Sequence, residues 1–177
     1  MSTVYFISDL HLGHKNILKF AGEYRRGATV EEHDEWLVNQ WNAIVHKNDL
    51  VYVLGDVAFT LDSLRNIGRM RGQKILIMGN HDKYPLEEYL KYFRTIRPSP
   101  FPYKKFWLSH CPIHPAELRG RMNVHGHVHH NTLPDKRYIN VSVEPLCGLP
   151  MSLEELIKMH DKYIAASKHF NIVEDTG

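Results

Sequence analysis

The chain has 177 residues, 43% of them hydrophobic and 24% charged, and its formal net charge at neutral pH is +2. This composition is typical of soluble globular proteins and excludes the disordered, fibrous and membrane classes. The net charge is too small to indicate tight binding to the phosphate backbone of nucleic acids. The two cysteines, Cys111 and Cys147, lie outside any CxxC spacing, so we expect reduced thiols and neither a disulfide framework nor a zinc knuckle.

The length suits one domain over residues 1–177, built around a single core. No apolar run approaches the roughly 18 residues that indicate a membrane span, and the N-terminus lacks the features of a signal peptide. We therefore expect a cytoplasmic protein without membrane contact. The sequence does not indicate the oligomeric state.

Six short apolar segments have the composition of buried strands, since they are rich in Val, Ile, Leu and aromatic residues and end near Gly, Ser or Asp. Helical patterns lie between the early segments, and this alternation predicts βαβ units and a parallel sheet. The later segments follow one another more closely, which predicts additional hairpin-like pairing. The fold class is therefore α/β with α+β features. The predicted strands are residues 3–8, 50–55, 74–79, 106–110, 122–126 and 138–143.

The first predicted helix begins at Thr29, which forms a capping box with Glu32, and its apolar residues keep to one face as far as Ile44. A second, weaker helix is predicted over residues 61–70. A third begins at Pro85, a residue suited to the first helical position. The predicted apolar face of this third helix is Leu86, Tyr89, Leu90 and Phe93.

A Pro-rich surface loop is predicted over residues 97–105. The last helix begins at a second capping box, formed by Ser152 and Glu155. We expect this helix to end near Ser167.

Residue types that bind metals follow nearly every predicted strand. The motifs are DLH after Ile7, GD after Leu54, GNHD after Met78, a single His after Ser109 and GHVH after His125. The carboxyl ends of parallel strands gather at one edge of a sheet, where α/β proteins place their binding sites. We therefore expect these distant segments to converge in space.

These residues supply carboxylate, imidazole and amide oxygen atoms without thiolate, a set that suits Mn, Fe, Zn or similar divalent ions. Seven ligands are too many for one four-coordinate ion but fit two ions that share Asp56. Two ions about 3.5 to 4 Å apart can hold a bridging hydroxide and stabilise in-line displacement at phosphorus. Asp9 and His11, two residues apart, would point to the same side of an extended chain. The candidate ligands are Asp9, His11, Asp56, Asn80, His110, His127 and His129.

The ordered motifs DLH, GD, GNHD, H and GHVH resemble those of the calcineurin-like metallophosphoesterases, and the chain is similar to compact single-domain members from bacteria and phages. The resemblance implies a four-layer αββα sandwich with mixed β-sheets. It also implies two divalent metal ions, with Mn²⁺ as the first candidate and Fe, Zn, Ni or Co as alternatives, and a catalytic role for Asn80 and His81. The implied ligands of one ion are Asp9, His11, Asp56 and His129, and those of the other are Asp56, Asn80, His110 and His127.

The implied reaction is hydrolysis of a phosphoester by a metal-bridging hydroxide, with His81 as proton donor or transition-state stabiliser. Asp56 is not followed by the second Asp and the Arg of the GDxxDRG motif, which argues against a protein phosphatase. Because a dianionic monoester calls for such an Arg, a phosphodiester of nucleotide-like or cyclic kind is preferred as substrate over a phosphomonoester. A metal-binding scaffold without catalysis is a third possibility, against which the intact His81 argues.

The sequence leaves open which carboxylate orients His81, although Asp82 is adjacent to it. His14, Arg119 and Arg121 are candidate substrate contacts, and local packing is an equal alternative for His14. Structural roles are expected for His114, His125, His130 and Cys111, with the Cys111 thiol buried.

Overall fold

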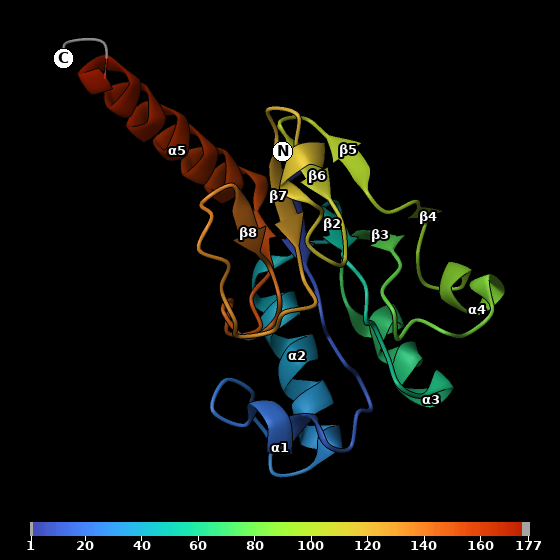
Figure 1. Cartoon of the computed structure of the whole chain (residues 1–177). Coiled ribbons are helices and arrows are strands. Elements are labelled where there is room, and N and C mark those ends of the chain that lie inside the picture. The colour runs from blue at the N-terminus through green and yellow to red at the C-terminus, as the bar shows by residue number, and fades with distance from the viewer. Residues whose placement is uncertain (1, 175–177) are drawn as a thin grey trace.

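Two β-sheets packed face to face form the centre of the molecule, with helices on their outer sides (Figure 1). The computed structural model describes residues 2–174, and side chains as far as residue 167. The predicted α/β fold with two mixed sheets flanked by helices is confirmed.

The first sheet has the strand order β4-β3-β2-β1-β9. Its strands β1 to β4 are parallel, and β9 runs antiparallel to β1 at one edge. The parallel strands therefore end at the same side of the molecule. They are β1 (Val4–Ile7), β2 (Leu50–Val53), β3 (Gln73–Ile77) and β4 (Thr95–Arg97), with β9 at Met151–Ser152.

The second sheet has the strand order β5-β6-β7-β8, in which β5 is antiparallel to β6 and the other pairs are parallel. A parallel bridge between Ser8 and Ser142 connects the ends of the two sheets beyond β1 and β8. The loops after both sets of parallel strands thus meet. The strands are β5 (Phe101–Tyr103), β6 (Phe106–Leu108), β7 (Met122–His125) and β8 (Tyr138–Asn140).

The helices begin largely where the capping residues predict. The Thr29 hydroxyl accepts a hydrogen bond from the Glu32 backbone N–H, and the Glu32 carboxylate accepts one from Ala28. No helix in the described part of the chain is both long and apolar enough to cross a membrane. The helices are α1 (Ile17–Ala21), α2 (Val30–Ile44), α3 (Leu61–Leu64), α4 (Leu86–Leu90) and α5 (Leu153–Glu174), with short 3-10 turns at Arg65–Arg69 and Pro115–Glu117.

The strands of the first sheet bury both of their faces because successive side chains point to opposite sides. In β1, Phe6 lies in the core between the two sheets, whereas Ile7 lies in the core beneath the helices. Tyr52 and Val53 of β2 divide in the same way. Trp41 of α2 is fully buried in the helix-side core. This burial on both faces explains why the strands read as continuous apolar runs.

Several sequence predictions need correction. The hairpin-like pairing predicted for the later strands is wrong, since β6, β7 and β8 pair in parallel. The segment predicted as a surface loop contains β5, where Pro102 is tolerated because β5 is an edge strand. Leu86 and Leu90 do not face inward, since α4 is a short helix and these side chains are 50% and 51% exposed. Helix α5 continues past Ser167 and projects from the body of the molecule (Figure 1), and α1 was not predicted.

Lys74 carries a buried ammonium group at the start of β3. Its Nζ donates hydrogen bonds to the carbonyl oxygens of Met70 at 2.6 Å and Gly72 at 3.1 Å. Burial lowers the pKa of Lys74 to about 8, from an ordinary value of 10.5. The folded chain therefore releases this proton at a lower pH than the unfolded chain does.

We expect the Lys74 side chain to make the free energy of unfolding rise as the pH increases from about 8 to about 10. In this window the unfolded chain binds the proton and the folded chain does not, so deprotonation favours folding. Lys74→Met should remove this part of the pH dependence, while the exposed Lys83→Met should retain it. Urea unfolding of all three chains across the window measures the difference, and equal slopes for wild type and Lys74→Met would contradict the expectation.

Candidate metal centre

All seven candidate ligands lie in loops at the carboxyl ends of parallel strands. Asp9 and His11 follow β1, Asp56 follows β2, and Asn80 follows β3 in the first sheet. The remaining candidates, His110, His127 and His129, follow β6 and β7 of the second sheet. Both sheets therefore contribute to one cluster.

The backbone turns sharply at most of these positions. Asp9, His11, Asp56, His127 and His129 all have positive φ, between 52° and 70°. Non-glycine residues adopt this left-handed conformation rarely, and such strain of about 1 to 3 kcal/mol per residue is typically held by the surrounding structure at functional sites. The structure thus holds five of the candidate ligands in an unfavourable backbone conformation.

The expected extended geometry for Asp9 and His11 is wrong, because both residues are left-handed. Their backbone N–H groups donate to the carbonyl oxygens of Gly55 and Asp56, each at 3.0 Å. The side chains therefore converge because the two loops are hydrogen-bonded together. Leu10, between them, is buried in the helix-side core.

The first group of ligand atoms contains polar atoms without partners. Asp9 Oδ1 and His11 Nε2 are both buried, have no hydrogen-bond partner and lie 3.7 Å apart. His11 Nε2 is also 3.7 Å from Asp56 Oδ2. The other Asp9 oxygen accepts hydrogen bonds from the His127 N–H and the Ser142 hydroxyl. Buried polar atoms left unpaired are costly, and a cation among them would satisfy the whole group.

The second group is centred on His110. Its Nε2 lies 2.9 Å from Asn80 Oδ1, 3.2 Å from His127 Nδ1 and 3.4 Å from Asp56 Oδ2. Its Nδ1 lies 2.8 Å from the Leu54 carbonyl oxygen, to which a ring N–H must donate. This assigns the lone pair to Nε2 in the neutral ring. Asp56 Oδ2 belongs to both groups, as a residue shared between two metal ions would.

Asp9 and His11 have shifted pKa values that suit metal binding. Burial alone would raise the pKa of Asp9, but the neighbouring His11 imidazole and the charges of other nearby histidines hold it well below its usual range. Burial lowers the pKa of His11. An ionised carboxylate and a neutral imidazole are the forms that bind metals.

A buried ion pair stands behind His129. The His129 Nδ1 lies 3.0 Å from Glu144 Oε1, and the Arg25 guanidinium lies 2.7 Å from the same oxygen. Arg25 also donates to the backbone carbonyls of Asp9 at 2.6 Å and Leu10 at 3.0 Å. A carboxylate on the far nitrogen of a histidine fixes the ring orientation and leaves the other nitrogen free for a ligand.

Sequence reasoning missed Arg25 and Glu144. They are 119 residues apart, and neither lies in a metal-binding motif. Arg25 stands in the polar segment GEYRRG, which reads as solvated surface, yet its side chain is only 2% exposed.

Asp82 holds the loops of the cluster together. Its carboxylate accepts hydrogen bonds from the backbone N–H groups of Asp56, Val57 and Gly79, at 2.8 to 2.9 Å. Both oxygens are therefore engaged by backbone N–H groups, and no hydrogen bond joins Asp82 to the His81 ring in the described part of the chain.

Two glycines leave room for the ligand carboxylates. A Cβ atom on Gly79 would overlap Asp56 Oδ1, and one on Gly126 would overlap the Ser8 hydroxyl and Asp9 Oδ2. Each carboxylate thus fills the volume that a side chain would need.

The three predicted substrate contacts separate. His14 lies beside the cluster, with its ring stacked on Phe59 at a centroid distance of 4.0 Å. Arg119 is exposed and pairs with Glu117. Arg121 precedes β7, stacks on Trp107 and donates to the Lys104 carbonyl oxygen. The structure does not bring the two arginines to the cluster, because Arg121 is at the amino end of a strand whose carboxyl end holds the ligands.

The expected burial of Cys111 is wrong, since the residue is exposed. Its sulfur lies within 4.8 Å of ring nitrogens of His110 and His127, so it adds a thiol to the rim of the cluster. His114 has the expected structural role, because its Nδ1 accepts a hydrogen bond from the Ala116 N–H.

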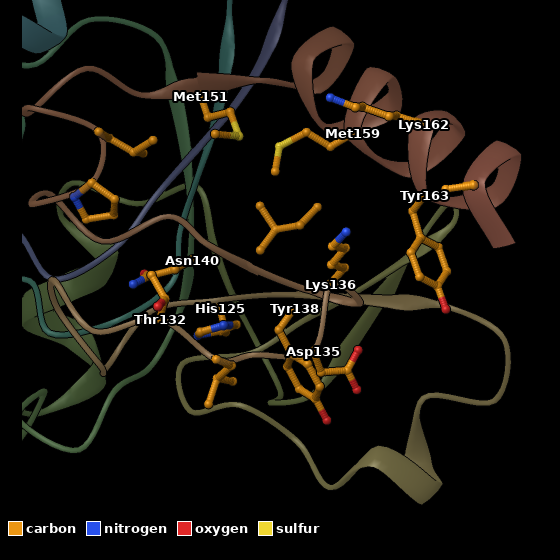
Figure 2. Close-up of a pocket in the computed structure, with 15 residues that line it drawn as sticks. His125, Thr132, Asp135, Lys136, Tyr138, Asn140, Met151, Met159, Lys162 and Tyr163 are labelled. Atoms are coloured by element: carbon orange, nitrogen blue, oxygen red, sulfur yellow. The ribbon is translucent and has the colours of Figure 1, made fainter. Parts of the chain in front are cut away.

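Two cavities are relevant to the position of the site. The larger, of about 610 Å³, lies between α5 and β8, and Figure 2 shows Tyr138, Met159 and Tyr163 around it. It contains none of the candidate ligands. The smaller, of about 400 Å³, is lined by His11, His81 and His129. The smaller cavity is therefore the one connected to the ligand cluster.

Residues 2–173 match the family model described as calcineurin-like phosphoesterase. The chain is 33% identical over 174 residues to an uncharacterized protein of Methanocaldococcus jannaschii, with 92% of this chain and 93% of that one covered. It is 30% identical over 182 residues to the gene 66 protein of Mycobacterium phage D29, covering 81% and 89%. A protein of unknown function from Aquifex aeolicus has a similar structure, with a TM-score of 0.73, 28% identity, and 90% and 100% of the two chains covered.

We expect Asp56→Asn to lose most of the divalent metal that the wild-type chain binds, because its carboxylate faces both groups of ligand atoms. Metal content after incubation with Mn²⁺ and dialysis measures the loss, and circular dichroism checks the fold. The matched control is His114→Ala, a histidine outside the cluster. Equal metal content in Asp56→Asn and the control would contradict a shared role for Asp56.

We expect Glu144→Gln to weaken metal binding by about 10- to 100-fold, the usual effect of losing a carboxylate behind a ligating histidine. Calorimetric titration with Mn²⁺ measures the affinity of a chain whose helical content is unchanged. An unchanged affinity in a folded variant would mean that Glu144 serves only to neutralise Arg25.

Proposed function

The chain belongs to the calcineurin-like phosphoesterase family, and on this basis we propose that it is a metal-dependent hydrolase of phosphodiesters. Small nucleotide-like or cyclic diesters are the proposed substrates, and a phosphomonoester is the second candidate. The seven candidate ligands and His81 keep the roles that the motifs imply.

The observation that carries the proposal is the unpartnered pair Asp9 Oδ1 and His11 Nε2. These atoms lie with Asp56 Oδ2 in a buried place, and neither has a hydrogen-bond partner there. A structural role would leave such atoms hydrogen-bonded. A divalent cation is the ligand that satisfies carboxylate and imidazole together.

Two ions would be held by Asp9, His11, Asp56 and His129 on one side and by Asp56, Asn80, His110 and His127 on the other. Bound there, they would supply Lewis acidity toward the phosphoryl oxygens and water of lowered pKa. The Arg25–Glu144 pair keeps the His129 ring in place, and the Leu54 carbonyl does the same for His110.

His81 is the proposed proton donor to the departing oxygen. Its backbone N–H donates to Asp56 Oδ1 at 2.9 Å, which fixes the residue beside the shared carboxylate. The side chain is exposed at the cavity, with its ring centroid 5.9 Å from that of His11 and 5.0 Å from that of Phe59. It can therefore meet a leaving group without being part of the ligand set.

The preference for diesters is supported by the charges around the cavity. Among the described residues that line it, none is Lys or Arg. Arg25, the nearest buried arginine, is engaged by Glu144 and by backbone carbonyls. A diester carries one negative charge fewer than a monoester dianion and needs less positive charge for binding.

We expect His81→Ala to retain its metal content and to lose about 10²- to 10⁴-fold in kcat, the usual contribution of a positioned acid. The assay uses bis-p-nitrophenyl phosphate as diester and p-nitrophenyl phosphate as monoester, with Mn²⁺ present. His114→Ala is the control for loss of an unrelated histidine.

The wild-type chain should hydrolyse the diester with the higher kcat/KM. The reverse order would favour the monoesterase alternative. Full metal content without turnover of either ester would contradict the enzymatic function and favour a scaffold.

A further inference from the structure

The cavity beside the ligand cluster has mainly aromatic walls. Phe20, Phe59 and His14 line it together with His81 and His130. No Lys, Arg, Asp or Glu is among its described lining residues. Such walls offer flat surfaces and no lysine or arginine to bind a second phosphate.

Phe59 and His14 form a ready stacking platform. Their rings are parallel within 5° at a centroid distance of 4.0 Å. Phe59 also stacks on His11 at 5.2 Å. The platform is therefore in contact with a candidate metal ligand, which places it next to the position of a bound phosphoryl group.

Phe20 of α1 lies beside this platform. Its side chain is 71% exposed, although it lines the cavity, and its ring centroid is 6.1 Å from that of His14. Ile17 and Ala21 of the same helix are buried, so α1 is anchored while Phe20 faces the opening. Exposing a phenylalanine has a cost that packing against a ligand would remove.

A second aromatic pair includes His130, which lines the cavity. The rings of Tyr24 and His130 stack within 7° at 5.2 Å. This contact links the segment after α1 to the loop that carries His127 and His129. The aromatic wall is thus fixed relative to the ligand cluster.

We propose that this cavity is a binding site for a planar aromatic group of the substrate, placed by Phe20 and by the Phe59–His14 platform next to the scissile phosphodiester. The inference rests on the proposed function and adds to it the chemical class of one substituent: a nucleobase or an aryl group. Aromatic walls without Lys or Arg favour such a group over a sugar phosphate or an alkyl chain.

Two diesters with the same leaving group test the proposal. Bis-p-nitrophenyl phosphate and methyl p-nitrophenyl phosphate both release nitrophenolate, and they differ in whether the retained group is aromatic. With Mn²⁺ present, the wild-type chain should prefer the aryl ester in kcat/KM. Phe20→Ala should reduce the ratio of the two kcat/KM values at least about fivefold, the lower range of a lost stacking contact.

Leu86→Ala is the matched control, because Leu86 is an exposed apolar residue on α4, 50% exposed and outside the cavity. It should keep the wild-type ratio, and Phe20→Tyr should keep it as well. An unchanged ratio in Phe20→Ala, with both esters hydrolysed, would overturn the aromatic site and leave the proposed function standing. Hydrolysis of neither ester by the metal-loaded wild type would overturn both.

Discussion

The carboxylate of Asp9 connects the two halves of the molecule. One of its oxygens accepts hydrogen bonds from the His127 N–H and the Ser142 hydroxyl, both from loops of the second sheet, although Asp9 itself follows the first strand of the first sheet. Its backbone carbonyl accepts a hydrogen bond from the buried Arg25. This contact joins the loops that carry His127 and Ser142 to the loop after β1.

Bringing several carboxylates and imidazoles into one buried place is unfavourable without compensation. Two sets of buried groups around the ligands offset part of this cost. Asp82 accepts three backbone N–H groups and holds the loops after β2 and β3. The Arg25–Glu144 pair neutralises itself and orients His129. A small group of polar atoms at the centre has no hydrogen-bond partner. The left-handed backbone of five candidate ligands holds these atoms close together.

Local patterns in the sequence predicted local structure well. The Thr29 capping box, the apolar runs and the order of the motifs were enough to anticipate the parallel strands of the first sheet, α2 and the edge at which the candidate ligands meet, but not the parallel pairing of β6, β7 and β8. Contacts between distant segments were beyond such reasoning. Nothing near Arg25 indicates that it is buried against Glu144, and Leu86 and Leu90 fit a helical face that the short α4 does not bury. Arg119 and Arg121 lie between two ligand motifs in the sequence. In the structure they precede β7, whose carboxyl end leads to the ligands, so they lie at the opposite end of that strand from the cluster.

The glycines before Asn80 and His127 have a consequence for how this chain can change. Since the carboxylates of Asp56 and Asp9 occupy the space of a missing Cβ at Gly79 and Gly126, even one methyl group there would displace a ligand from its neighbour. A substitution at either glycine would therefore also change the position of a ligand carboxylate. Substitutions that preserve the ligand geometry are therefore confined to the cavity walls, such as α1. A new side chain there can change which substrate binds without moving the metal ligands.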